Sequence, residues 1–239
     1  MAPERRRIRA VLFDLGGTLI DNYDFTHYAN LARRCFLEVE EEPLAHALAE
    51  VERETDCPHP TARDEWTNPE FWGAVLARAT GKAVDRATAE RFLALARSEP
   101  GSYRLYSDSR RCLEELADQG RRLGIVSNST SEARVRAILD RAGVLPFFER
   151  IISSGSEGVA KPDPEIFRRA LGRMKLDGPE ALYVGNLAYT DAQAARAAGL
   201  HGIWLNRAGT GLGSDPPEIT SLLEVPLCVR RLEAGEPVA

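Results

Sequence analysis

The residues best suited to chemistry in this 239-residue chain stand directly after short apolar runs. Asp14 follows one run and precedes a glycine pair, which places a carboxylate beside backbone N–H groups able to hold an anion. Ser127 ends a second run, where its hydroxyl and the N–H of Asn128 can meet a phosphate oxygen. The compact ammonium of Lys161 can pair with a carboxylate and a phosphate together. These residue types predict a site for a small anion.

These side chains can act together only if the fold brings the ends of the apolar runs to one place. Runs of strand length occupy residues 8–13, 123–127, 151–153, 181–185 and 202–205, and segments of helical periodicity occupy 110–120, 131–142, 164–173 and 190–198. This alternation predicts a doubly wound α/β core with a parallel, Rossmann-like sheet, in which ligands bind beyond the carboxyl ends of the strands. Asp14, Ser127 and Asn186 stand at such ends.

A long segment interrupts the alternation with helical periods and no convincing strand. Its expected helices span residues 31–40, 44–55, 69–80 and 87–98, with breaks at Pro43, Pro58 and Gly81. We therefore expect a core of residues 1–21 and 104–239 and an inserted all-helical cap of residues 22–103.

Charge and composition narrow the class of partner. The formal net charge of −5 and the absence of a basic stripe argue against nucleic acid, so a small molecule is the expected partner. The apolar stretch after Arg5–Arg7 ends at Asp14, too early for a signal peptide, and no other stretch is long enough to span a bilayer. We expect a cytoplasmic protein. Composition and motifs do not indicate its oligomeric state.

The cysteines lack the paired spacing of a disulfide framework or a zinc site. They are Cys35, Cys57, Cys112 and Cys228. Cys57 and His59 lie close together, but no second pair completes a zinc set, so we interpret C-P-H-P as a proline-rich loop.

Four segments together resemble the ordered motifs of the haloacid dehalogenase superfamily. They are V-L-F-D-L-G-G-T-L-I-D at 11–21, I-V-S-N-S at 125–129, G-V-A-K-P-D-P-E-I-F at 158–167 and Y-V-G-N-L-A-Y-T-D at 183–191. The position of the helical insert is typical of the first subfamily. This resemblance implies a phosphatase acting on a small phosphorylated metabolite, in which Asp14 forms an aspartyl-phosphate.

The resemblance also implies roles for the other motif residues. Ser127 and Asn128 would bind the substrate phosphate, and Lys161 would stabilise charge during transfer. The expected cofactor is Mg²⁺. Its implied ligands are Asp14, the backbone carbonyl of Gly16, Asn186 and Asp191.

Two positions depart from the family pattern. Gly16 replaces the aspartate that protonates the leaving group, and loss of such an acid typically lowers the rate by about two to four powers of ten. Asn186 replaces an acidic magnesium ligand, so Mg²⁺ binding is expected to be weak. Asp21 and Asp24 are alternative acids, although both positions favour turn or solvent-facing roles.

Three other functions fit parts of this pattern. A metal-independent 2-haloacid dehalogenase also lacks the second aspartate, but the tyrosine and Ser-x-Asn pattern of those enzymes is absent. A phosphonate-cleaving enzyme needs a cap lysine, and Lys82 lies late in the cap. A phosphate-ligand binding protein that has lost catalysis would explain both departures.

Overall fold

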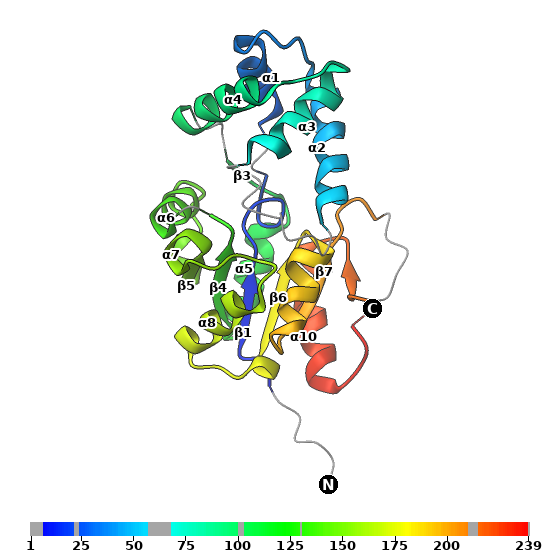
Figure 1. The fold of residues 1–239 in the computed structure, drawn as a ribbon. Helices are drawn as coiled ribbons and strands as arrows, with labels where there is room; N and C mark the ends of the chain where they lie inside the picture. The colour runs from blue at the N-terminus through cyan, green and yellow to red at the C-terminus, as the bar shows by residue number, and fades with distance from the viewer. Residues whose placement is uncertain are drawn as a thin grey trace. The chain divides into compact units, whose positions relative to one another are not determined.

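The computed structural model describes residues 7–21, 24–56, 68–99, 103–129, 131–209 and 215–238. The chain divides into two compact units, Met1–Asp21 with Arg104–Ala239 and Asn22–Tyr103. The first unit is an α/β structure and the described part of the second is helical (Figure 1).

The first unit is built on a six-stranded parallel sheet with the order β5-β4-β1-β6-β7-β8. The strands are β1 (Ala10–Phe13), β4 (Arg122–Ser127), β5 (Phe148–Ser153), β6 (Ala181–Gly185), β7 (His201–Leu205) and β8 (Glu218–Ile219). Strand order reverses on either side of β1, which is the switch point where doubly wound folds bind ligands. This confirms the predicted fold class. The two-residue strand β8 was not predicted because two residues carry no periodicity.

Helices cover both faces of the sheet. They are α5 (Ser109–Asp118), α6 (Glu132–Arg141), α7 (Ser154–Glu157), α8 (Pro164–Met174), α9 (Ala194–Ala197) and α10 (Val225–Ala234), with short turns η2 (Leu145–Phe147), η3 (Gly178–Glu180), η4 (Ala188–Gln193) and η5 (Leu222–Glu224). Phe167 of α8 and Ala195 of α9 pack with Leu12 and Tyr183 in one buried cluster. Helices α5 and α10 pack together on the other side (Figure 1). The sheet is therefore buried on both faces.

A two-stranded antiparallel ribbon lies in the first unit where the chain leaves it and returns. It consists of β2 (Ile20–Asp21) and β3 (Arg104–Leu105). Sequence patterns did not predict this ribbon, because each strand has only two residues.

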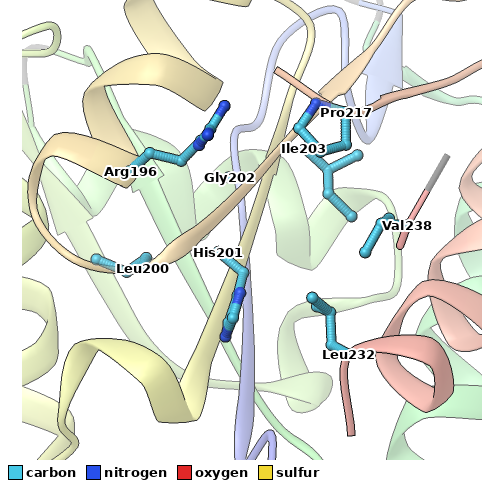
Figure 2. A pocket seen from close by; sticks show the side chains of 8 residues that line it. All are labelled: Arg196, Leu200, His201, Gly202, Ile203, Pro217, Leu232 and Val238. Carbon is cyan, nitrogen blue, oxygen red and sulfur yellow. The ribbon is translucent and has the colours of Figure 1, made fainter. Parts of the chain in front are cut away.

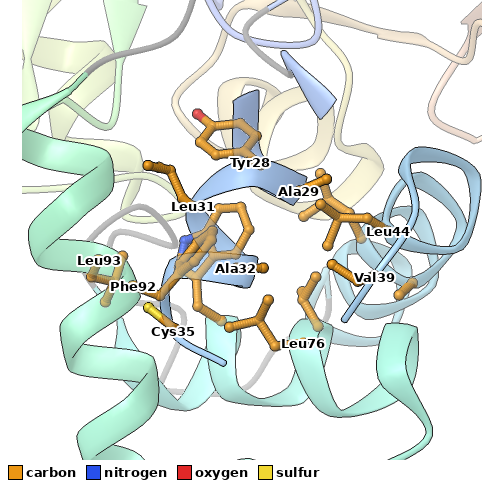
Figure 3. Packing of buried hydrophobic residues seen from close by; sticks show 14 of the residues in the cluster. Tyr28, Ala29, Leu31, Ala32, Cys35, Val39, Leu44, Leu76, Phe92 and Leu93 are labelled. Atoms are coloured by element: carbon orange, nitrogen blue, oxygen red, sulfur yellow. The ribbon is translucent and has the colours of Figure 1, made fainter. Parts of the chain in front are cut away.

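The described second unit consists of α1 (Phe25–Arg34), α2 (Glu41–Thr55), α3 (Pro69–Thr80) and α4 (Arg86–Ser98). Its core is aromatic and aliphatic (Figure 3). The Trp72 ring centroid lies 5.5 Å from that of Tyr28 and 5.0 Å from that of Phe92. Phe71 and Trp72 are both buried in this cluster.

Two predictions for this unit were wrong. The helix expected at 31–40 is α1, which begins after the N-cap Asp24 and ends at Arg34. The chain then turns at Phe36, with φ of 63°. Pro43 does not break a helix but lies in the first turn of α2, where an N–H would have no partner within the helix.

Two further helix predictions for this unit agree with the structure. The predictions at 69–80 and 87–98 correspond to α3 and α4. Cys57, Pro58 and His59 lie outside the described residues. Among the helices that the structure does describe, none has the length and apolar character needed to cross a membrane.

Candidate functional site

A buried lysine bridges two buried aspartates at the carboxyl edge of the sheet. The Lys161 Nζ atom lies 2.6 Å from Asp14 Oδ1 and 2.6 Å from Asp191 Oδ1. All three residues are less than one-tenth exposed. Residues from three separated motifs therefore meet at one point, beyond the end of β1.

Tyr183 completes this centre from within β6. Its hydroxyl accepts a hydrogen bond from Lys161 Nζ at 3.0 Å and lies 3.0 Å from Asp191 Oδ1 and 3.1 Å from the Val126 carbonyl. A buried tyrosine hydroxyl needs such partners, and here it holds the ammonium between the carboxylates. Burial, together with Asp191 and Asp14, raises the pKa of Tyr183, so this hydroxyl stays protonated.

The local sequence allows unusually close approaches at this edge. Gly17 has φ of 72°, and a Cβ atom there would lie 2.5 Å from Asn186 Nδ2. A Cβ atom on Gly185 would lie 2.3 Å from Asp191 Cγ. Asp191 itself sits in η4, a π-helical turn, and its Oδ2 accepts from the Leu187 N–H at 3.0 Å. The turn folds the carboxylate back toward the strand ends.

The electrostatics of the centre are not balanced. Burial raises the pKa of Asp14 to about 6 despite the opposing effect of Lys161, and Asp191 adds to the rise. Burial alone would lower the pKa of Lys161, but the two carboxylates outweigh it and raise the pKa to about 12. One ammonium thus serves two carboxylates, and when both are ionised the trio has a formal charge of −1.

The predicted phosphate-binding residues occupy the end of β4. Ser127 is its last residue and is 8% exposed. The Asn128 side chain exchanges two hydrogen bonds with the Lys161 backbone, donating to its carbonyl at 2.9 Å and accepting from its N–H at 2.8 Å. The side chain of Asn128 therefore fixes the segment that carries Lys161. Its own backbone N–H lies beside Ser127.

Thr18 links Asp14 to Asn186. The Thr18 hydroxyl is 3.5 Å from Asp14 Oδ2 and 3.3 Å from Asn186 Oδ1. The backbone carbonyl of Asn186 accepts from the Trp204 indole at 3.0 Å. The structure thus brings the first and fourth motifs into contact. Asp24, considered as an alternative acid, caps α1 and accepts from the His27 N–H at 3.0 Å.

A family model for haloacid dehalogenase-like hydrolases matches residues 8–199, which include every residue of this centre. The chain belongs to the haloacid dehalogenase-like hydrolases. It is therefore a hydrolase.

The hydrolase has curated relatives that are named as phosphatases. It is 32% identical over 213 residues to a glyceraldehyde 3-phosphate phosphatase of Pyrococcus abyssi, covering 82% of this chain and 81% of that protein. It is 31% identical over 227 residues to a phosphoserine phosphatase of Thermus thermophilus, covering 91% and 88%.

Solved structures of the family share the fold. A HAD-hydrolase, YfnB of Bacillus subtilis, crystallised with magnesium, superposes with a TM-score of 0.70 at 24% identity and covers 94% of this chain and 99% of that one. A 2-haloacid dehalogenase of Pseudomonas syringae superposes with a TM-score of 0.61 at 26% identity and covers 94% and 99%.

The predicted metal ligands of the hydrolase differ in how free they are. Both carboxylate oxygens of Asp191 are engaged by protein donors, and the residue is 1% exposed. Among the described residues, no three His, Cys, Asp or Glu side chains form a group that could hold a metal. Asp14, the Gly16 carbonyl and the Asn186 amide oxygen remain, and Mg²⁺ accepts one carboxylate with neutral oxygens and waters. This donor set fits Mg²⁺ but carries little negative charge.

The hydrolase also has a cavity beside β7 (Figure 2). It is lined by Arg196, Leu200, His201, Gly202, Ile203, Pro217, Leu232 and Val238. His201 is the first residue of β7, so the cavity lies at the amino end of that strand, whereas Asp14 follows the carboxyl end of β1. None of the predicted site residues lines it.

Sequence reasoning missed Tyr183 and a second ion pair, in which the half-buried Arg207 meets the buried Asp108. The strand pattern around Tyr183 carried a signal, since alternate residues of a strand face the same side and Tyr183 precedes Gly185 by two. Arg207 and Asp108 are 99 positions apart and outside the four motifs, so no spacing could have paired them.

Proposed function

We propose that this hydrolase is a phosphatase of a small phosphorylated metabolite, with Asp14 as its nucleophile. The observation that carries the proposal is the buried Lys161 ammonium, 2.6 Å from both Asp14 and Asp191 at the carboxyl edge of the sheet. This arrangement suits a phosphate, because an ammonium beside the nucleophile offsets repulsion between the carboxylate and the phosphate. The phosphatase names of the two relatives support the same chemistry.

The proposed reaction has two displacements at phosphorus. A carboxylate oxygen of Asp14 forms a bond to phosphorus while the ester P–O bond breaks, and the leaving oxygen departs with the electron pair. Water then attacks phosphorus, releases inorganic phosphate and restores the carboxylate. Lys161 stabilises the charge of the transferring group, while the Ser127 hydroxyl and the Asn128 N–H hold its oxygens.

Gly16 determines which esters should react. Without an aspartate at this position the leaving oxygen takes its proton from water, so leaving groups of low pKa should depart most readily. We expect acyl and aryl phosphates to react faster than sugar phosphates.

Mg²⁺ would be held by Asp14, the Gly16 carbonyl and the Asn186 amide oxygen. When bound, the cation would offset the negative charge of the phosphate. Asp191 lies outside this direct ligand set because its oxygens are engaged by Lys161, Tyr183 and the Leu187 N–H. Its role in the proposal is to hold the ammonium in place.

In this proposal the two units have different tasks. The unit of residues 1–21 and 104–239 is the catalytic core, and the helical unit of residues 22–103 is a cap that restricts access of water and substrate.

The test is a hydrolysis panel with acetyl phosphate, p-nitrophenyl phosphate and glucose 6-phosphate over a range of Mg²⁺ concentrations. The wild type should hydrolyse the first two faster than the third, and Asp14→Asn should reduce the rate to that of buffer. Asp118→Asn, the same change at an exposed position on α5, should leave the rate unchanged. Activity that survives Asp14→Asn would contradict the proposal.

A 2-haloacid dehalogenase is the second candidate, favoured by the similarity to the Pseudomonas syringae enzyme and by the small number of free carboxylates. In that reaction Asp14 would displace halide from carbon, and water would cleave the resulting ester. Halide release from 2-chloropropionate without metal, lost in Asp14→Asn, would favour it. If neither substrate class reacts but phosphate raises the melting temperature, a phosphate-binding role is favoured.

A further inference from the structure

The loop that carries Asp14 is held by an arginine from a distant part of the chain. Arg207 follows β7, and its Nη2 atom donates to the Thr18 carbonyl at 2.8 Å. Thr18 is fully buried, and its hydroxyl reaches both Asp14 and Asn186. The guanidinium therefore contacts the backbone of the residue whose side chain touches Asp14.

Asp108 fixes this guanidinium in turn. Arg207 Nη1 lies 2.9 Å from Asp108 Oδ2, and Nη2 lies 3.0 Å from Asp108 Oδ1, a bidentate pair. Asp108 Oδ2 also accepts from the Ser221 hydroxyl and the Leu222 N–H, each at 3.0 Å. The Arg207 Cζ atom lies 3.9 Å from the Tyr106 ring centroid, a cation–π contact. The arginine has little freedom to move.

The next carbonyl of the loop is held from the same side. The Leu19 carbonyl accepts from the Tyr106 N–H at 3.1 Å and from the Ser109 hydroxyl at 2.7 Å. Two consecutive carbonyls after Asp14 are thus fixed by residues outside the four motifs. Within the loop, the Leu19 N–H and the Ile20 N–H both bond to the Leu15 carbonyl at 3.0 Å.

We propose that Arg207, held by Asp108, is a positioning residue that fixes the Thr18 backbone and thereby the Thr18 hydroxyl against Asp14. The proposal rests on the phosphatase function proposed above. Its physical basis is that catalytic groups displaced by a fraction of an ångström lose much of their rate advantage.

Arginine is required at this position because one planar group makes three directed contacts. Its two terminal nitrogens meet both oxygens of Asp108, and one of them also reaches Thr18. A lysine ammonium is a point charge that can keep the ion pair but not this planar geometry. Arg207→Lys therefore keeps the positive charge beside Asp108 but removes the planar group that positions the Thr18 carbonyl.

The chain contains a matched control at the opposite end of β1. Arg121 makes a bidentate pair with Glu233, at 2.7 and 3.1 Å, and donates to the Ile8 carbonyl. Each arginine thus donates to a backbone carbonyl next to β1, Arg121 to the segment before the strand and Arg207 to the loop after it. Each also has a buried Nε without a partner among the described residues. Arg121 acts at the amino end of β1, away from Asp14.

The experiment compares Arg207→Lys with Arg121→Lys. Steady-state rates are measured with p-nitrophenyl phosphate, and hydrogen exchange is followed at amides of the loop and of the start of β1. We expect Arg207→Lys to lower kcat by about 10- to 100-fold with a smaller change in KM. The same variant should lower the protection from hydrogen exchange of the Leu19 and Ile20 amides relative to that of the Arg9 amide.

Arg121→Lys should show the reverse pattern, with unchanged kcat and lower protection at Arg9. Equal losses of kcat in the two variants, or loop protection unchanged in Arg207→Lys, would overturn the proposal. If Arg207→Lys does not fold, Asp108→Asn provides the second variant and should loosen the same amides. If the wild type shows no hydrolysis that depends on Asp14, the proposed function fails, whereas the exchange comparison still decides whether Arg207 fixes the loop.

Discussion

Asp14 and Asp108 are both buried aspartates paired with a cation, yet their environments shift their pKa values in opposite directions. Burial raises the pKa of Asp14 to about 6, because Lys161 does not compensate for it. Burial would also raise the pKa of Asp108, but Arg207, the Leu222 N–H and Ser221 outweigh it and hold the pKa below its ordinary value.

The difference lies in the number of donors that each carboxylate receives. Asp108 accepts two hydrogen bonds from Arg207 and two more from Ser221 and Leu222. Asp14 shares one ammonium with Asp191, accepts a hydrogen bond from the Leu15 backbone and has a long contact to Thr18. A carboxylate that is fully satisfied stabilises the fold, whereas one that is only partly satisfied remains available to react.

The largest expected effect comes from adding the missing acid beside Asp14. Gly16, unlike Gly17, is not among the glycines with a positive φ, so its backbone conformation does not exclude a side chain. Gly16→Asp should raise hydrolysis of an alkyl ester such as glucose 6-phosphate by about 10²- to 10⁴-fold. Steady-state rates at saturating Mg²⁺ measure this gain.

Gly16→Asn is the matched control, since it adds the same volume without an acid. It should give no gain. An equal gain in Gly16→Asn would show that shape rather than proton transfer limits the reaction.

The next effect is on the free energy of unfolding, which should change in opposite directions when Asp14 and Asp108 are each replaced by asparagine. Asp14 has a folded-state pKa of about 6, above its ordinary value of 3.8, so its ionisation destabilises the fold as the pH rises through this interval. Asp14→Asn should therefore increase the free energy of unfolding above pH 6, by about 1–3 kcal/mol, and the difference should vanish below about pH 3.8.

Asp108→Asn should instead decrease the free energy of unfolding. The lowered pKa of Asp108 contributes stability that is complete above its ordinary value and lost as the pH falls through the lowered value. The variant should be less stable at neutral pH by about 1–3 kcal/mol, and the gap should close in acid. Urea unfolding across the pH range measures both variants, and shifts of the same sign would contradict this account.

The smallest expected effect is on magnesium. Asn186→Asp adds a charged oxygen next to Thr18 and should strengthen Mg²⁺ binding by about tenfold. Titration calorimetry with Mg²⁺ measures the change, and Asn128→Asp is the control at an amide that bonds to the Lys161 backbone instead. Equal strengthening in both variants would argue against a metal position beside Asp14.

The sequence predicted the parts of the fold that repeat or alternate. Apolar runs located β1, β4, β5, β6 and β7, but β2, β3 and β8 have two residues each and leave no pattern. The start of α1 was missed because its signal is the single capping residue Asp24. Its end was missed because the helix stops at Arg34 and the chain turns at Phe36, whose positive φ no periodicity predicts.

The candidate site likewise contains residues that the sequence predicted and residues that it did not. The four motifs name Asp14, Lys161 and Asp191, which the structure brings into contact. The Arg207–Asp108 pair could not be predicted, because it depends on which loops meet after the sheet has formed. Motifs along the chain named groups that meet at this centre, whereas a pair formed between two distant loops is visible only in three dimensions.

The central claim is that Asp14 becomes phosphorylated during turnover. The most direct test is to quench the protein in acid during hydrolysis of acetyl phosphate and map the added phosphoryl group by peptide mass spectrometry. We expect the group on the peptide that contains Asp14, and its loss in Asp14→Asn. A phosphoryl group on another residue, or turnover of acetyl phosphate with no phosphoryl group trapped on the Asp14 peptide, would contradict the account.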